Sequence, residues 1–387
     1  MLSRPTTPVD RLFAGLLTLV LLTVVAVSFL TRNRAVIEGG GSEWIHGEWL
    51  INFAAGPVRR GLGGTVVLGL SEVFGTSPLA VIEVLQGGAV IGVILGVVLV
   101  LLAKGAPVRM CILALSPAFM LTWHNAFGTH GKEIFACLPF VPLLLAALTG
   151  RAFGLALILA ILLHGLAILL HETSVLFFPF LMVSGLSLIH RGLPRQQATL
   201  FAVGLTAVAS AGTGFTLLNM SVPSAEPICA ALTARGLSET LCGTPIAWVS
   251  NSGPDALAFT LGRLPDRDWL GIAATAILAY APLWIILRPA LPWRWILIGT
   301  ALTILAFLPL YLVAVDYGRW LNMQIAAISL TLLVIAATGW RDLLVAPMTR
   351  GLAWGLIALT LLWRVSLVSG GIGSGMAEPL VKAMLGV

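Results

Sequence analysis

Four short polar segments interrupt a strongly apolar sequence, and their side chains are of the types that transfer protons or bind anions. The segments are EGGGSEWIHGEWLINFAAGPVRRGLGG at 38–64, HGKE at 130–133, HET at 171–173 and DYGRW at 316–320. Apolar stretches of the length of membrane helices separate them. Any chemistry therefore depends on whether those helices bring the four segments together.

The carboxylates and imidazoles of these segments are candidates for general acid–base catalysis. We predict catalytic roles for Glu48, His171, Glu172 and Asp316, because ionisable groups between apolar helices face a protein interior or a water-filled cavity. A glutamate near an imidazole can orient it and raise its basicity. Two alternatives are structural: the glutamate of the first segment is a solvated surface acid, and Asp316 closes a turn by pairing with Arg319.

The basic and aromatic residues are candidates for binding a phosphate or a sugar. Guanidinium groups bind phosphate oxygens bidentately, and neighbouring glycines let main-chain N–H groups approach an anion. Aromatic rings either stack on a sugar or anchor helices at the membrane interface. We predict binding roles for Arg59, Arg60, His130, Lys132, Tyr317, Arg319 and Trp320. The alternatives are that the arginine pair contacts lipid headgroups and that Lys132 only neutralises Glu133 at a helix start.

No metal or other cofactor is predicted. His124 and His130 lack ligand spacing, and no HExxH or CxxC pattern is present, so a divalent metal has no support in the sequence. The sequence also lacks a Walker-type phosphate loop, a GxGxxG motif and a GxSxG motif. Cys229 and Cys242 are expected to form a disulfide in an oxidising outer compartment, which would stabilise their loop by roughly 3 kcal/mol.

The composition places most of the chain in a membrane. Of 387 residues, 58% are hydrophobic and only 10% are charged, whereas about a quarter of a soluble domain is charged. The net charge of +6 then reflects cytoplasmic loops, and no nucleic-acid partner is expected. We predict a single all-α transmembrane domain over 1–387, a helix bundle of about eleven spans. The spans are 11–30, 79–103, 108–125, 133–150, 152–170, 173–189, 197–218, 269–287, 295–315, 321–338 and 351–368.

Two long segments between the spans are expected to lie at the outer face. Segment 31–76 should contain an amphipathic helix over 43–53 lying on the outer membrane surface, followed by a glycine-rich stretch, 62–74, that is interfacial or re-entrant. Segment 219–268 should form an outer loop or lid. The pair His171-Glu172 is expected to form a turn between two spans.

The distribution of charge indicates the orientation. Every short connection on one side carries a lysine or arginine, which places the N-terminus in the cytoplasm. The first apolar run, 12–30, is longer than the core of a signal peptide and should remain as an anchor. On this arrangement all of the 16 acidic residues except Asp10, Glu83 and Asp342 lie outside, together with the four polar segments.

Taken together, EGGGSEWIHGEW, VRRGLGG, HGKE, HET and DYGRW on one face resemble the polytopic membrane glycosyltransferases of the GT-C type, including the O-antigen-polymerase-like branch. The resemblance implies a polyprenyl-phosphate-linked sugar as donor, a glycan or lipid acceptor, and a site among membrane lipids at the outer face of the bacterial cytoplasmic membrane. It also implies that Glu38, Glu43 or Glu48 corresponds to the acid of the first outer loop, and that Arg59, Arg60 and Arg319 hold the phosphate. Unlike the commoner GT-C pattern, this chain has no Asp-Asp or Asp-Glu pair after the first span.

The expected function is therefore that of an enzyme of polysaccharide biosynthesis in the cell envelope. It would be a membrane glycosyltransferase or polysaccharide polymerase that moves a sugar from an undecaprenyl (di)phosphate carrier to a hydroxyl acceptor. Arginines would stabilise the leaving group without a metal, and a carboxylate or imidazole would act as base. The alternative is a transporter or flippase for a lipid-linked or anionic solute, using the same arginines for binding. A third class is a structural subunit whose polar segments contact partner proteins.

Overall fold

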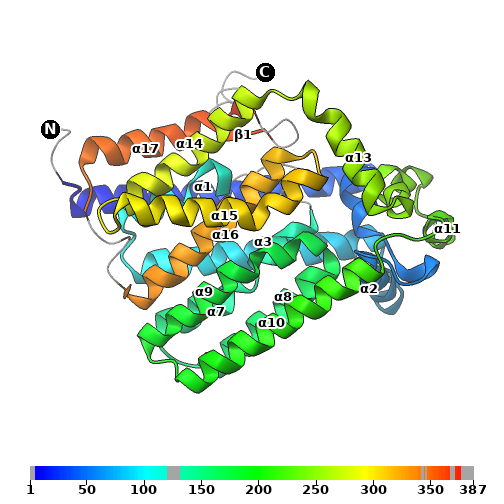
Figure 1. Ribbon diagram of the computed structural model, residues 1–387, viewed down its shortest axis with the longest axis horizontal. Coiled ribbons are helices and arrows are strands. Elements are labelled where there is room, and N and C mark those ends of the chain that lie inside the picture. The colour runs from blue at the N-terminus through cyan, green and yellow to red at the C-terminus, as the bar shows by residue number, and fades with distance from the viewer. Residues whose placement is uncertain (1–4, 120–130, 341–343, 345–346, 367–370, 376–387) are drawn as a thin grey trace.

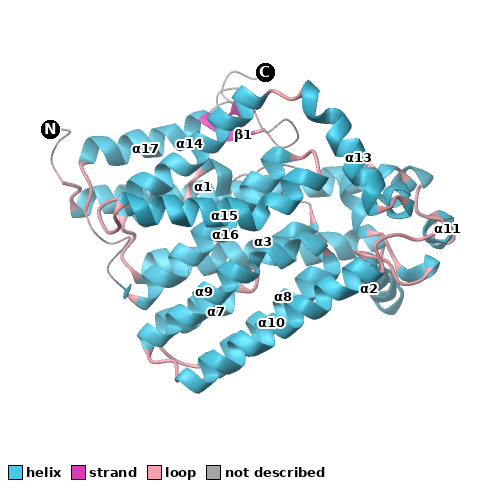
Figure 2. Ribbon diagram, in the orientation of Figure 1, coloured by secondary structure: helices cyan, strands magenta, loops and turns pink. Residues whose placement is uncertain are grey.

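Helices form nearly all of the chain that the computed structural model describes, which is residues 5–119, 131–340, 344, 347–366 and 371–375 (Figure 1). Within these ranges the β-structure consists of a short antiparallel hairpin, β1 (Trp363–Val365) and β2 (Ile372–Ser374), and an isolated bridge between Pro5 and Thr349 (Figure 2). The prediction of an all-α bundle is confirmed for the described residues.

Nine helical segments in the described ranges are long and apolar enough to cross a membrane. Their outer surfaces carry exposed leucine, isoleucine and valine, which match lipid tails rather than water. The chain is thus a multi-pass membrane protein. The segments are Pro8–Glu38 (α1), Pro78–Ala103 (α3), Lys132–Thr149 (η3 and α7), Phe153–Leu170 (α8), Glu172–Arg191 (η4, α9 and η5), Arg195–Leu218 (α10), Trp269–Leu287 (α14), Trp293–Val313 (α15) and Tyr317–Thr338 (α16).

Two of the eleven predicted spans have a different form. The predicted span 351–368 is α17 (Arg350–Leu362), whose 13 residues cover about 20 Å, and the chain then enters β1. The predicted span 108–125 begins as α4 (Val108–Ala114) and is interrupted before Pro117, because proline disfavours a helical conformation in the residue that precedes it. Residues 120–125 of that prediction lie outside the described residues.

The buried helix α16 organises the bundle. It is buried along almost its whole length and packs against α7, α9, α14 and α15. A second contact joins α8 to α10, where a Cβ on Gly212 would lie 2.6 Å from Ile168. Glycine at this position lets the two helices approach closely, as is common between membrane helices.

One end of the bundle, opposite the N-terminus, carries the non-spanning segments (Figure 1). Residues 219–268 form short helices there: α11 (Glu226–Thr233), η6 (Glu239–Cys242), α12 (Thr244–Ala247), η7 (Trp248–Ser250), α13 (Gly253–Arg263) and η8 (Leu264–Asp266). A disulfide between Cys229 and Cys242 joins α11 to η6. Arg235 pairs with Glu72 of α2 (Gly61–Phe74), so residues 219–268 contact this helix.

The segment after α1 does not form the predicted surface helix. Glu43–Gly47 make one π-helical turn (η1), after which Leu50 and Ile51 are completely buried. Residues 43–49 are helical, so the predicted helix over 43–53 is present only in its first part. Its predicted place on the membrane surface was wrong, because Trp49, Leu50 and Ile51 are enclosed by the protein. The amide of Gly64 donates to the carbonyl of Ile51 at 3.0 Å, so the segment turns into the protein and carries Glu48 with it.

Candidate functional site

Nine ionisable side chains, drawn from all four polar segments, meet at the end of the bundle opposite the N-terminus, and we call them the charged cluster. Its members lie at helix ends, where the backbone changes direction. Arg60 precedes α2 with a φ of 64°, His171 follows α8 in an extended conformation, and Asp316 precedes α16. The members are Glu48, Arg59, Arg60, Lys132, Glu133, His171, Glu172, Asp316 and Arg319.

Arg60 joins two carboxylates of the charged cluster. Its Nη1 donates to Glu48 Oε1 at 2.9 Å, while its Nε and Nη2 donate to the two oxygens of Glu172 at 2.8 and 2.5 Å. Arg59 adds a bond from Nη1 to Glu172 Oε1 at 3.3 Å. The forked guanidinium is suited to such bidentate contacts, and it is the same geometry with which arginine binds phosphate.

Arg319 approaches the cluster from the opposite side, at the start of α16. It pairs with Glu133, with Glu48 Oε2 at 3.5 Å and with Asp316 Oδ2 at 3.6 Å. The ion pair between Arg319 and Asp316, which we considered as a way to close the turn, is therefore present. It is one of three contacts that Arg319 makes with carboxylates. Glu133 was not among the predicted site residues.

Lys132 does not neutralise Glu133. Its Nζ donates to the main-chain oxygen of Arg60 at 3.1 Å and lies 5.7 Å from the ring centroid of Trp49. A Cβ on Gly63 would lie 3.0 Å from this Nζ, so glycine leaves room for the ammonium. Lys132 thus holds the backbone that presents the two arginines, and it is completely buried.

His171 connects two buried carboxylates. Its Nδ1 accepts from the amide of Thr173 at 3.4 Å and contacts Thr173 Oγ1 at 2.6 Å, so we assign the ring proton to Nε2. Nε2 faces Glu48 Oε1 at 3.1 Å and Glu133 Oε1 at 3.4 Å. Burial and the charge of Arg60 lower the pKa of His171, which favours the neutral ring. This geometry supports a positioning role rather than the catalytic role predicted for His171.

The carboxylates of Glu48 and Asp316 differ in accessibility and in acidity. The side chain of Glu48 is 6% exposed and that of Asp316 is 31% exposed. Burial alone would raise the pKa of Glu48, but the hydrogen bond from His171 and the charges of Arg319 and Arg60 hold it well below its usual value. Burial and the charge of Glu48 raise the pKa of Asp316 to about 6. Asp316 is therefore the better candidate for a base near neutral pH.

The aromatic residues beside Arg319 do not present open faces. Tyr317 and Trp320 are each 4% exposed. The ring of Tyr317 stacks on Tyr311 at 6.0 Å and lies under the guanidinium of Arg267 at 5.6 Å, so burial argues against the predicted sugar stacking. Trp269, 5.7 Å from Tyr317 and 47% exposed, has the more open ring. Trp269 is the first residue of α14, and nothing in the sequence indicated that its ring is open.

Glu48, Glu133 and His171 could hold a metal ion. Each offers one ligand atom, and these atoms lie within 4.8 Å of one another, in a mixed oxygen and nitrogen set that suits several divalent metals. Arg319 already pairs with both carboxylates, so a cation here would have to displace it. Helix packing creates this set from residues that share no sequence motif.

The other predicted site residues are placed as follows. His130 lies outside the described residues. Glu38 pairs with Arg34 on the exposed end of α1, and Glu43 lies beside Gly243 of residues 219–268. Of the three acids considered for the segment after α1, only Glu48 therefore joins the charged cluster. No protein-family model matches the chain, and comparisons with curated proteins and with solved structures likewise found no match.

Proposed function

We propose that this protein is a membrane glycosyltransferase that moves a sugar from a polyprenyl (di)phosphate carrier to a hydroxyl acceptor. The observation that supports this most directly is the convergence of Arg59, Arg60 and Arg319 on one group of carboxylates at an end of the bundle. A lipid-linked donor would place its phosphates at this level, between the hydrocarbon and the aqueous side. The arginines offer donors for phosphate oxygens without further protein ligands.

The proposed reaction breaks the bond between the sugar C1 and the phosphate oxygen. The electron pair leaves with the phosphate, whose developing negative charge is stabilised by Arg60 and Arg319. The acceptor oxygen forms the new bond to C1, and its proton passes to a carboxylate. To receive the phosphates, the arginines exchange part of their contacts with Glu172 and Glu133 for contacts with the donor.

Asp316 is the carboxylate that we assign as the base. It is the most exposed carboxylate of the charged cluster, and a pKa of about 6 leaves it ionised at neutral pH while it can still accept a proton in the transition state. Glu48 and Glu172 are bound by Arg60, so we assign them to holding that guanidinium in place.

Activity should rise with pH through about 6, the pKa of Asp316, because only its ionised form accepts a proton. Initial rates measured from pH 4.5 to 8 should show this rise, and Asp316→Asn should abolish the rise together with most of the activity. A rise that persisted in Asp316→Asn would exclude Asp316 as the base.

The raised pKa also means that ionising Asp316 destabilises the folded protein. Its stabilising contribution is full below about pH 4, near the unfolded value, and is lost as pH rises through about 6.

We further propose a bacterial cytoplasmic membrane with the N-terminus inside. The disulfide between Cys229 and Cys242 lies at the end that carries the charged cluster, and disulfides persist in an oxidising compartment. The donor would then be used on the outer side, as the expected envelope function requires.

The direct test is turnover by the purified protein. Wild type in micelles receives a polyprenyl-diphosphate-linked sugar and a glycan acceptor, and release of the polyprenyl diphosphate is measured with and without EDTA. Release that depends on the acceptor supports transfer, and loss of release with EDTA would show that transfer needs a divalent metal, for which Glu48, Glu133 and His171 are the candidate ligands. Movement of the lipid-linked sugar across proteoliposomes without bond cleavage would instead support the transporter alternative.

A further inference from the structure

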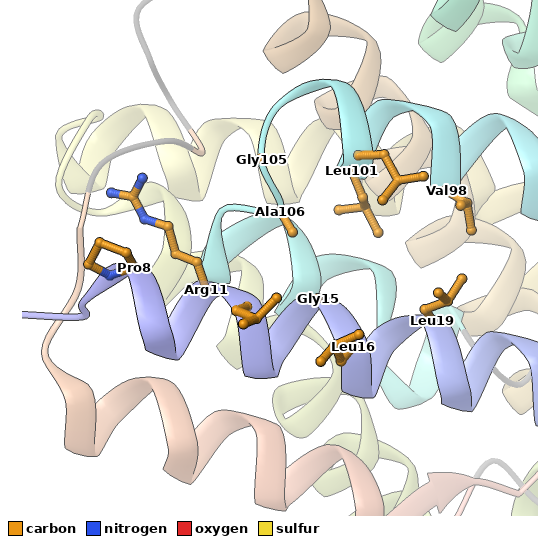
Figure 3. Close-up of a pocket in the computed structure, with 11 residues that line it drawn as sticks. Pro8, Arg11, Gly15, Leu16, Leu19, Val98, Leu101, Gly105 and Ala106 are labelled. Carbon is orange, nitrogen blue, oxygen red and sulfur yellow. The ribbon is translucent and has the colours of Figure 1, made fainter.

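A lateral groove lies between α1 and α3 (Figure 3). It begins at Pro8, the first residue of α1, whereas the segments of the charged cluster follow the other end of this helix. Its volume is about 430 Å³, within the range of sites for small ligands. The walls are apolar side chains of the two helices: Leu12, Leu16 and Leu19 of α1, and Val98, Leu101 and Leu102 of α3.

The groove has a defined floor and a defined length. A Cβ on Gly15 would lie 2.8 Å from the Cβ of Ala106, so the turn after α3 packs directly on α1. That turn needs positive φ angles at Gly105 and Ala106. From Arg11 to Leu19 the groove follows α1 for about 12 Å, which is most of the depth of one leaflet of hydrocarbon.

Arg11 supplies a cation at the mouth of the groove, where Figure 3 shows it among the lining residues. The neighbouring carboxylate of Asp10 does not neutralise it, because Asp10 accepts from Thr7, Arg350 and Trp354. No acidic side chain within the described ranges forms an ion pair with Arg11. Among the described residues that line this apolar groove, Arg11 is the charged one, and the groove opens beside exposed, lipid-facing leucines.

We propose that this groove binds one anionic phospholipid of the leaflet on the N-terminal side. One acyl chain lies between α1 and α3, and the phosphate accepts from the guanidinium of Arg11. A headgroup with a net negative charge is preferred because the residues that line the groove in the described ranges include the cation of Arg11 and no carboxylate. This inference is independent of the reaction proposed for the charged cluster.

Native mass spectrometry of the detergent-solubilised full chain tests the proposal, with phosphatidylglycerol and phosphatidylcholine of matched acyl chains as probes. We expect one phosphatidylglycerol to bind more tightly than the rest and more tightly than phosphatidylcholine. Arg11→Gln should weaken that binding about fivefold, the factor expected of one basic residue at an anionic headgroup. Leu16→Trp should fill the groove and reduce the binding of both lipids.

Arg195→Gln is the matched control. Arg195 is exposed at the start of α10 and lines no part of the groove, so its loss should leave the tight site unchanged. Gel filtration of each variant confirms that it is folded. Equal binding of both lipids, an equal effect of Arg11→Gln and Arg195→Gln, or full binding by Leu16→Trp would each overturn the proposal in favour of unspecific annular lipid.

Discussion

Replacing Arg60 with alanine is expected to lower the free energy of unfolding by about 3–5 kcal/mol, the effect of removing one partner from a buried ion pair. Arg60 is the cation that joins Glu48 to Glu172, and Glu48 is almost completely buried. Without the guanidinium, Glu172 keeps only its bond to Arg59, and Glu48 keeps only its contacts with Arg319 and His171, in a space that water enters poorly. Arg60→Lys should restore little, because one ammonium cannot reproduce contacts with both acids at once. Denaturant unfolding in micelles measures the change.

The specificity of this effect can be tested with two further variants. Arg34→Ala removes a pair with Glu38 whose side chains are 74% and 64% exposed, and such pairs contribute little, so its unfolding should match wild type. Adding Glu172→Gln to Arg60→Ala should recover part of the lost stability, because it removes the charge of one of the two carboxylates that have lost Arg60 as a partner. If Arg60→Ala were as stable as Arg34→Ala, the charged cluster would not be the buried network described above.

The membrane helices could be predicted from the sequence because the bilayer imposes a simple requirement. A run of about 20 apolar residues must form a helix to satisfy its backbone in hydrocarbon, and α3, α8, α14 and α15 follow directly from such runs. The turn between α8 and α9 could also be predicted, since His171 and Glu172 are the polar residues that interrupt a nearly continuous apolar stretch.

The pairing within the charged cluster could not be predicted in the same way. Lys132 and Glu133 are adjacent in the sequence, but neighbouring residues of a helical turn do not face each other. Their partners, Arg60 and Arg319, come from other segments. These contacts depend on the packing of α3, α8 and α16 around η3, which no local pattern encodes.

The segment after α1 shows a second limit. Spacing alone made residues 43–53 resemble a helix on the membrane surface, yet Leu50 and Ile51 are completely buried. The hydrogen bond from Gly64 to Ile51 joins two parts of the chain whose relation depends on tertiary structure. As a result the sequence identified Glu48 only as one of three candidates for the acid of this segment, and could not distinguish it from Glu38 and Glu43.

Arg319→Ala is expected to reduce kcat for sugar transfer by about 100- to 1,000-fold, the usual effect of removing one donor that stabilises a developing charge. Arg319 reaches Glu133, Glu48 and Asp316, so the guanidinium that we propose for the leaving phosphate lies beside the proposed base. Arg319→Lys should recover only a small part, because the ammonium lacks the planar fork. Steady-state rates with the lipid-linked donor measure kcat and KM separately. Arg263→Ala is the matched control, because Arg263 lies at the end of α13 over the ring of Phe259 and is not part of the charged cluster.

Glu133→Gln separates positioning of Arg319 from its charge. The amide keeps the shape of the side chain and can still accept a hydrogen bond, but it removes the ion pair that holds Arg319. We expect a loss of roughly tenfold in kcat with little change in KM, smaller than for Arg319→Ala because the guanidinium remains and needs only to be reoriented. If Arg319→Ala raised KM alone and left kcat unchanged, Arg319 would bind the donor equally in the ground state and in the transition state. The leaving group would then have to be stabilised by Arg59 and Arg60 alone.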